Sequence, residues 1–98
     1  MHRRTKALAL TKAVKDAVWE RDGHTCVLCG SPYAFPEAHY ISRAQGGLGV
    51  EENVVTLCLS CHGRYDNSAE RPYIRPRLAA YLRGQYPGWD EGNLIYRK

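Results

Sequence analysis

Apolar residues recur at helical spacing in the first quarter of the chain. Val14, Val18 and Trp19 form an apolar stripe on a helical repeat. Thr11 precedes the stripe and is a residue type that caps helices, and Gly23 follows it as a stop signal. The pattern therefore predicts a helix that begins near Thr11 and ends near Gly23.

Two later segments have the pattern of β-strands. In residues 37–41 (EAHYI), Ala38 and Tyr40 alternate with His39 and Ile41, as expected for the two faces of a short strand. Residues 54–58 (VVTLC) are a β-branched run, which favours a second strand or the approach to a helix. Pro32 and Pro36 are expected to prevent regular structure between residues 31 and 37.

The remaining segments complete an α+β pattern. Residues 59–66 and 77–86 favour helices, although Gly63 weakens the first of them. Residues 1–10 are basic and lack a long apolar pattern, so we expect a flexible basic arm. Residues 11–98 contain no internal repeat and no linker, and are expected to form one small α+β domain.

Length and composition limit the class of protein. A chain of 98 residues has a marginal apolar core, and a metal ion or disulfides often supply the missing stability at this size. No segment approaches the roughly 20 apolar residues that a membrane-spanning helix needs. The N-terminus is a poor signal peptide. We therefore expect a cytoplasmic protein without membrane contact, whose four cysteines are reduced and bound to metal.

The net charge of +4 is unevenly distributed. Residues 1–21 carry six basic and two acidic side chains, and residues 64–98 carry seven and four, whereas residues 22–63 carry one and four. Basic ends around an acidic centre suit a polyanion such as nucleic acid, with a divalent cation near the centre. Composition alone still favours the simpler interpretation of solvated surface charge.

The cysteines form two Cys-x-x-Cys pairs, Cys26 with Cys29 and Cys58 with Cys61. Two such pairs can supply four thiolates to one tetrahedral zinc ion at about 2.3 Å each. The segment between the pairs is longer than a short zinc-finger loop, so we expect it to be a folded insertion. The pattern favours a structural zinc site over disulfides or free thiols, and that site needs no further ligand.

His62 follows this cysteine pair directly and is then available for another role. If residues 59–66 are helical, His62 and Asp66 lie on one face with Cβ atoms about 5–6 Å apart, which suits two ligands of a second cation. His39 lies on the predicted strand of the insertion. A histidine that deprotonates water beside such a cation is the arrangement of a metal-dependent phosphodiesterase. Taken singly, each of these residues fits an ordinary structural or surface position, but together with the cysteines they favour the site.

The sequence resembles HNH endonucleases of the zinc-containing ββα-metal type. The resemblance is carried by residues 26–30 (CVLCG) and 38–67 (AHYISRAQGGLGVEENVVTLCLSCHGRYDN). It is most similar to the small HNH proteins of tailed bacteriophages and prophages. The two cysteine pairs, His39, the glycine loop, Asn53 and the Cys-x-x-Cys-His run occur in the family order. The resemblance extends from about Thr11 to the C-terminal segment. It implies a ββα-metal core stapled by a four-cysteine zinc site and flanked by N- and C-terminal helices.

The resemblance implies roles for individual residues. His39 matches the general base, and Asn53 matches the residue that braces the loop and thereby orients the base. His62 matches a metal-binding histidine, and Asp66 falls where some members carry a further ligand. The implied cofactor is one divalent ion, Mg²⁺, Mn²⁺ or Ni²⁺. The implied reaction is hydrolysis that leaves 5′-phosphate and 3′-hydroxyl ends.

One position departs from the family pattern. Many members place a histidine or aspartate directly before the general base as a metal ligand, and Ala38 stands there in this chain. Glu37 would point to the other side of a regular strand, so it can replace that ligand only if the strand is bulged. Otherwise His62, Asp66, water and the DNA phosphate would hold the ion weakly. Ser42 stands where proline is common, a difference expected to matter little.

The leading hypothesis is a metal-dependent DNA endonuclease that nicks DNA as a monomer. The resemblance implies a role in phage DNA processing or packaging, with terminase or other packaging proteins as partners, in the host cytoplasm if the protein is phage-encoded. Basic side chains expected near DNA are Arg3, Arg4, Lys6, Arg43, Arg64, Arg71, Arg75 and Arg77. One alternative is a zinc-ribbon module that has lost catalysis and only docks on nucleic acid or a packaging protein. A weaker alternative is a purely structural zinc protein.

Overall fold

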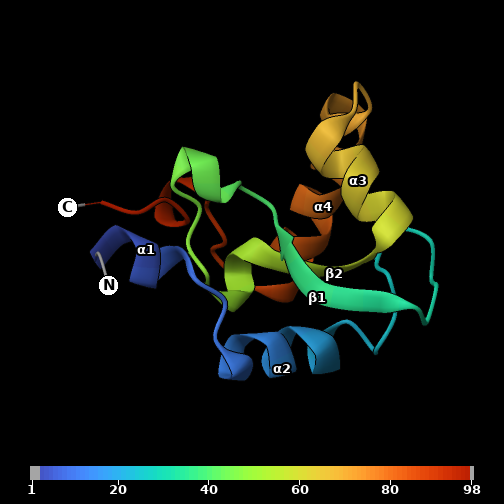
Figure 1. The fold of residues 1–98 in the computed structure, drawn as a ribbon, viewed down its shortest axis with the longest axis horizontal. Helices are drawn as coiled ribbons and strands as arrows, with labels where there is room; N and C mark the ends of the chain where they lie inside the picture. The colour runs from blue at the N-terminus through green and yellow to red at the C-terminus, as the bar shows by residue number, and fades with distance from the viewer. Residues whose placement is uncertain (1–2, 98) are drawn as a thin grey trace.

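The computed structural model describes residues 3–97 and places them in an α+β fold (Figure 1). Its helices and strands are α1 (Arg3–Leu8), α2 (Lys12–Arg21), β1 (Ala34–His39), β2 (Val54–Cys58), α3 (Leu59–Asn67) and α4 (Arg71–Gln85). Within this described part, no helix is long and apolar enough to cross a membrane. The strand–strand–helix succession and the helices on either side of it confirm the predicted fold class.

The centre of the fold is the antiparallel hairpin of β1 and β2. Phe35 pairs with Leu57 but Ala38 pairs with Val55, so β1 has one extra residue between these pairs and forms a β-bulge. Pro36 lies in this unpaired stretch, where its missing N–H removes no ladder hydrogen bond. The expectation that Pro36 would prevent regular structure was therefore wrong, and the strand begins earlier than predicted.

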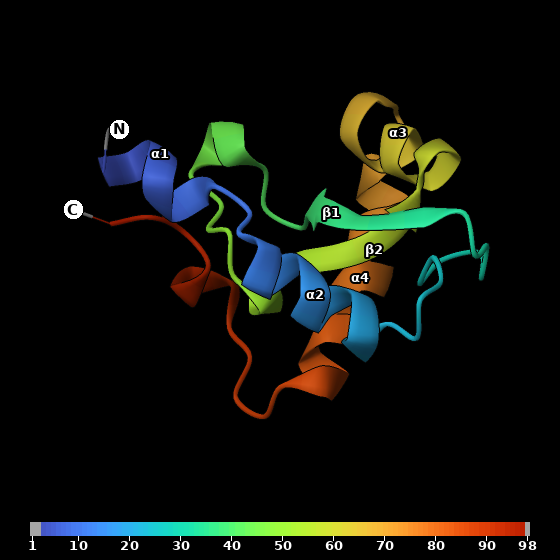
Figure 2. The same cartoon turned by 60° about the horizontal axis from the view of Figure 1, so that its bottom comes forward.

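Helices cover the hairpin from several directions. Figure 1 shows α3 rising from the end of β2, and the turned view of Figure 2 shows α2 in front of the hairpin and α4 behind it. Among the described residues, the largest fully buried apolar side chains are Tyr40, Tyr65, Leu57, Leu78, Leu82 and Val18. All of them except Val18 belong to one apolar cluster, and Trp19 of α2 packs against it. One core therefore joins the hairpin to α2, α3 and α4.

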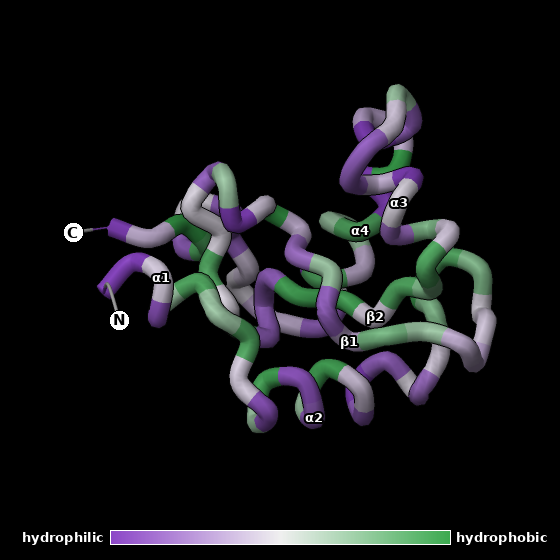
Figure 3. The backbone as a smooth tube through the Cα atoms, viewed as in Figure 1, coloured by the Kyte–Doolittle hydropathy of each residue, from purple (hydrophilic) through white to green (hydrophobic). Residues whose placement is uncertain are grey.

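Helix α2 lies where the apolar stripe predicted it. Thr11 caps its start, because the Thr11 hydroxyl accepts a hydrogen bond from the Val14 N–H at 3.2 Å. Gly23, just past its end, has φ of +67°, a conformation that glycine adopts without strain. Hydrophobic and hydrophilic residues alternate along the helix (Figure 3), and Val18 is completely buried.

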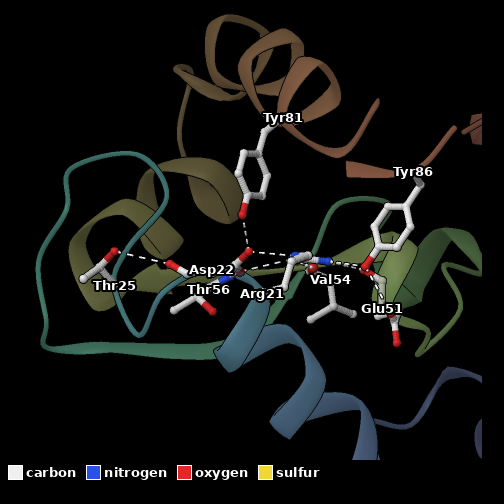
Figure 4. A network of polar contacts seen from close by, with 8 residues as sticks. All are labelled: Arg21, Asp22, Thr25, Glu51, Val54, Thr56, Tyr81 and Tyr86. Carbon is white, nitrogen blue, oxygen red and sulfur yellow. Dashed lines mark hydrogen bonds and ion pairs between the residues drawn. The ribbon is translucent and has the colours of Figure 1, made fainter. Parts of the chain in front are cut away.

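The end of α2 is tied to β2 and α4 by a buried polar network (Figure 4). The Arg21 guanidinium donates to the Glu51 carbonyl oxygen at 2.6 Å and lies 2.7 Å from the Asp22 carboxylate. Asp22 accepts hydrogen bonds from the Thr56 N–H at 2.8 Å and from the Tyr81 hydroxyl at 2.5 Å. These bonds satisfy the buried carboxylate and fix three elements relative to one another.

Residues 3–8 form helix α1, which differs from the flexible arm expected for residues 1–10. Leu8 is 2% exposed, and the Gly49 N–H donates to the Ala7 carbonyl oxygen at 3.0 Å. The apolar end of the segment is thus buried by a loop far along the chain, a partner that local pattern does not indicate. The first two residues lie outside the described part of the chain.

Helix α4 spans Arg71–Gln85 and begins six residues before the predicted start. Pro72 lies in the first turn, where an N–H has no partner within the helix. Pro76 lies inside the helix and removes one backbone hydrogen bond. Ile74 and Leu78 flank it and are buried, so tertiary packing outweighs the local cost of the proline.

Candidate active site and metal centre

Four cysteines converge where the hairpin meets α3. Cys26 and Cys29 lie in the turn after α2, Cys58 ends β2, and Cys61 lies in the first turn of α3. Their sulfur atoms all lie within 4.8 Å of one another. Thiolates bound at about 2.3 Å to a tetrahedral zinc ion stand about 3.8 Å apart. The set therefore fits one metal ion such as zinc, as the spacing of the two pairs predicted.

Backbone hydrogen bonds shape the two turns that hold the cysteine pairs. The Gly30 N–H donates to the Cys26 carbonyl oxygen at 2.8 Å, and Gly30 adopts φ of +80°, which glycine tolerates. The Cys61 N–H donates to the Cys58 sulfur at 3.4 Å. Burial opposes ionisation of Cys26, but hydrogen bonds from neighbouring backbone N–H groups lower its pKa to about 7. Burial raises the pKa of Cys61, so of these two thiols Cys26 ionises more readily.

A second feature is a cavity of about 540 Å³ that lies between β1, α3 and the loop joining the strands. His39, at the end of β1, lines it together with His62 and Asp66 of α3. The other lining residues are Glu37, Ser42, Arg43, Ala44, Gln45, Asn67 and Arg71. The fold therefore gathers the general-base candidate and the two proposed cation ligands around one open volume.

His62 and Asp66 lie one turn apart on α3, with Nε2 of the histidine 2.9 Å from Oδ2 of the aspartate. Their side chains are 29% and 38% exposed, so both are reachable from solvent. Neighbouring ligands of an octahedral ion at 2.0–2.1 Å stand about 3 Å apart, so the pair has the spacing of two ligands of one ion. Among residues 3–97, the cysteines are the only group of three or more potential ligands at metal-binding distance.

His39 is buried, with 8% of its surface exposed. Its Nε2 atom lies 3.1 Å from the carbonyl oxygen of Leu8, the last residue of α1. Burial lowers the pKa of His39 below its ordinary value, and the Leu8 carbonyl only partly opposes that shift. The imidazole is consequently neutral at pH 7 and able to accept a proton.

Asn53 is fully buried and joins the two ends of the loop that follows β1. Its Oδ1 accepts a hydrogen bond from the Ile41 N–H at 2.8 Å, and its Nδ2 donates to the carbonyl oxygens of Ile41 and Leu48 at 3.1 and 2.9 Å. The Tyr40 N–H donates to the Asn53 carbonyl at 2.7 Å. A Cβ at Gly47 would come within 1.7 Å of the Ile41 carbonyl oxygen, so only glycine fits this close approach. These contacts fix the chain immediately after the histidine of β1.

The bulge in β1 alters which side chains reach the cavity. Ala38 is completely buried and offers no ligand atom. Glu37 is exposed and lines the same cavity as His39. The bulged strand that Glu37 requires in order to approach the site is therefore present.

The arginines near the site differ in their surroundings. Arg43 and Arg71 line the cavity. Arg64 does not line it, because its guanidinium pairs with Glu70, with Nε 2.7 Å from Oε2. Arg75 is also engaged, since it stacks over the Tyr40 ring and lies 3.3 Å from Glu91. The other predicted DNA-contacting residues are exposed on α1 (Arg3, Arg4, Lys6) and α4 (Arg77).

Arg71 has a larger place in the site than the sequence indicated. It donates to the carbonyl oxygens of Tyr65 and Tyr40 at 3.1 and 3.3 Å, and its guanidinium lies 4.1 Å from the centre of the Tyr65 ring. It also lies 3.9 Å from Asp66. Sequence reasoning assigned it only to backbone contact with DNA, because nothing in the motif marks the first residue of α4 as part of the cavity.

The site thus consists of a buried histidine at the end of a β-hairpin, a histidine–aspartate pair on the following helix and an adjacent cluster of four cysteines able to bind a metal ion. Residues 26–68 match the family model described as HNH endonuclease. No curated protein sequence matches the chain. The matched segment contains all four cysteines, both histidines of the cavity and Asn53, whereas α1, α2 and α4 lie outside it.

Proposed function

We propose that the protein is a metal-dependent DNA endonuclease that hydrolyses phosphodiester bonds and nicks one strand as a monomer. The HNH endonuclease domain supports nuclease activity. The observation that carries the proposal is the shared cavity, lined by a buried histidine from β1 and by the His62–Asp66 pair from α3. A proton acceptor beside a cation-binding pair is what phosphodiester hydrolysis requires.

Each residue of the cavity has a role in this proposal. His39 takes a proton from the attacking water, and its lowered pKa keeps it neutral and basic at pH 7. His62 and Asp66 would hold the divalent ion, Mg²⁺, Mn²⁺ or Ni²⁺. Glu37 lines the same cavity without standing at metal-binding distance of that pair, so its side chain would have to turn toward the ion to replace the ligand that Ala38 cannot supply. When bound, the ion supplies positive charge that stabilises the phosphate in the transition state.

Basic residues would hold the DNA. Arg43 and Arg71 line the cavity and are placed to meet the negative charge of the reacting phosphate. The exposed cations of α1, together with Arg77, are assigned to the flanking phosphates. Because Arg64 and Arg75 are engaged by carboxylates, we assign them a smaller share of the binding.

A plasmid assay tests the proposal directly. Supercoiled DNA incubated with Mg²⁺ or Mn²⁺ is expected to become nicked, and a chelator is expected to stop the reaction. His39→Ala should reduce the rate by about 100-fold or more, the contribution of a general base. His24→Ala is the matched control, because His24 follows α2, is exposed, stacks on Trp19 and does not line the cavity. Undiminished activity in His39→Ala would refute the assignment of the base.

The biological setting proposed for this activity is phage DNA processing or packaging. It rests on the resemblance of the motif order to small phage HNH proteins, and it includes terminase or another packaging protein as partner in the host cytoplasm. Binding of the purified protein to purified terminase subunits, measured by calorimetry, tests the partner separately from nicking. Nicking without such binding would leave the nuclease and remove the packaging role.

Ala38 favours a second candidate function, a zinc-knuckle module that binds nucleic acid without cutting it. The position before the histidine of β1 offers no ligand atom and is completely buried. This alternative expects DNA binding that weakens as salt rises, and no cleavage with Mg²⁺, Mn²⁺ or Ni²⁺. The plasmid assay described above therefore separates the two functions.

A further inference from the structure

Helix α1 supplies the polar contact of the histidine on β1. The contact joins His39 Nε2 to the Leu8 carbonyl oxygen at 3.1 Å. A carbonyl oxygen can only accept, so Nε2 must carry the hydrogen and donate it. In the neutral ring, the hydrogen on Nε2 leaves Nδ1 as the unprotonated nitrogen. Among residues 3–97, no group makes a hydrogen bond to that Nδ1 atom.

The segment that provides this carbonyl is held tightly against the loop between the strands. The Gly49 N–H donates to the Ala7 carbonyl oxygen at 3.0 Å. A Cβ at Gly49 would come within 2.1 Å of the Ala9 carbonyl oxygen and 2.9 Å of the Leu8 carbonyl oxygen. Any side chain at this position would have to move the end of α1, so the close approach depends on glycine.

Two further contacts hold α1 in the same place. Leu8 is 2% exposed and anchors the end of the helix in the core. The Arg4 guanidinium donates to the carbonyl oxygen of Arg43 at 3.3 Å, and Arg43 itself lines the cavity. The helix is therefore attached to the loop at both of its ends, although it lies outside the matched HNH segment.

We propose that α1 is a positioning element of the active site: the Leu8 carbonyl, held in place through Gly49, fixes the His39 tautomer and makes Nδ1 the proton acceptor. This inference rests on the proposed nuclease function. In the step it describes, Nδ1 takes a proton from water, the resulting hydroxide forms a bond to phosphorus, and the bond from phosphorus to the 3′ oxygen breaks. The leaving oxygen then takes up a proton from solvent.

The tautomer can be measured in the full-length wild-type protein without DNA. Long-range ¹H–¹⁵N correlation spectra distinguish a protonated from an unprotonated ring nitrogen, and the His39→Ala spectrum identifies the His39 signals. We expect a protonated Nε2 and an unprotonated Nδ1. A ring protonated at Nδ1, or an averaged mixture of tautomers, would overturn the inference even if the protein nicks DNA. The expected tautomer in a protein that never nicks DNA would instead refute the proposed function.

Gly49→Ala tests the docking of the helix. Displacement of the Leu8 carbonyl should mix the two His39 tautomers and lower kcat by about 100-fold, the effect of misplacing a catalytic group by about 1 Å. KM should change less than kcat, because Arg43 and Arg71 stay in the cavity. Gly84→Ala is the matched control, since Gly84 lies in α4 with nothing near its Cβ position. A single Nε2–H tautomer and a wild-type kcat in Gly49→Ala would overturn the inference.

If Gly49→Ala does not retain its zinc and its fold, Leu8→Ala replaces it. This variant keeps the backbone but removes the buried side chain that anchors the end of α1. Tautomer mixing together with a fall in kcat supports the positioning role. An unchanged tautomer with an unchanged kcat contradicts it.

Discussion

Asn53 shows how one buried amide can organise an active-site loop. Its side chain makes three hydrogen bonds to the backbone at Ile41 and Leu48, on either side of the glycine turn. The two bonds to Ile41 are buried, so removal of the amide would leave the Ile41 N–H and carbonyl oxygen without those partners. The residue therefore supports the loop, and through it the end of β1, by bonds to the backbone.

Asn53→Ala is expected to lower the free energy of unfolding by about 3 kcal/mol, since buried backbone groups lose their partners. Nicking should fall as well, because the chain after His39 is no longer fixed. Urea unfolding monitored by circular dichroism measures the first effect. Asn93→Ala, at an exposed position, should leave the stability unchanged. Equal stability of the two variants would contradict the bracing role.

Tyr81 should make the fold sensitive to alkaline pH. Burial, and then its hydrogen bond to Asp22, raise the pKa of Tyr81 to about 12. Between pH 10 and 12 the unfolded chain ionises this tyrosine while the folded chain keeps the proton. The folded state then binds more protons, so stability is full below pH 10 and falls as pH rises toward 12. Tyr81→Phe should show a shallower fall in urea unfolding across this range, whereas the exposed Tyr33→Phe should match the wild type.

At the scale of residues, the sequence indicated the side chains that belong to a recognisable motif. It did not indicate the Leu8 carbonyl or the place of Arg71. The cysteine pairs, His39, Asn53 and His62 stand in a motif whose order can be read directly. Leu8 contributes a main-chain carbonyl, which every residue has, so no residue type marks its role. The place of Arg71 depends on how α4 packs, and the sequence contains no equivalent signal.

At the scale of elements, the bulge in β1 decides what the strand presents to the cavity. A regular strand would place Glu37 and Ala38 on opposite faces in fixed alternation, and one extra residue changes that alternation between Phe35 and Ala38. Pro36 lies in this stretch and fits there because a bulge needs fewer ladder bonds. From the sequence, Glu37 could reach the cavity only if the strand were bulged. The pairing of β1 with β2 shows that the bulge is present.

Glu37→Gln tests whether the bulged strand β1 supplies a ligand to the proposed catalytic ion. The measurement is the Mn²⁺ dependence of nicking. If the carboxylate helps to hold the catalytic ion, the Mn²⁺ concentration that gives half-maximal nicking should rise about tenfold or more. The thermal stability should not change, because Glu37 is exposed. Glu20→Gln, also exposed and located on α2, is the control and should leave the Mn²⁺ dependence unchanged. A wild-type titration in Glu37→Gln would exclude the carboxylate from the ion site.

The helices at the two ends illustrate what local pattern leaves out. Helix α1 is short, and helices of this length are not stable alone, so its formation depends on burial of Leu8. Helix α4 continues through Pro76 because Ile74 and Leu78 are buried against α3 and the hairpin. In both cases tertiary contacts outweigh local helix propensity. Local sequence patterns do not show which tertiary contacts will form.

At the scale of the whole molecule, the four-cysteine site connects the turn after α2, the end of β2 and the start of α3. A single apolar core in a chain of 98 residues is marginal, so a bound metal is expected to contribute a large share of the stability. Cys58→Ala should abolish the cooperative thermal transition seen by circular dichroism. His62→Ala should keep that transition and lose only the catalytic ion. A stable, folded Cys58→Ala protein would show that the metal is not required for folding.

The position of α1 against the loop between the strands also determines which residues a transplanted version of the proposed nuclease must include. A fusion protein that carries only the matched segment, residues 26–68, would keep the four cysteines and the His62–Asp66 pair. It would lose the Leu8 carbonyl, Arg71 and the Arg21–Asp22 anchor. The smallest transferable cutting module therefore begins at α1 and continues through α4. These boundaries follow from the contacts that α1, α2 and α4 make with the site, and they extend beyond the matched segment on both sides.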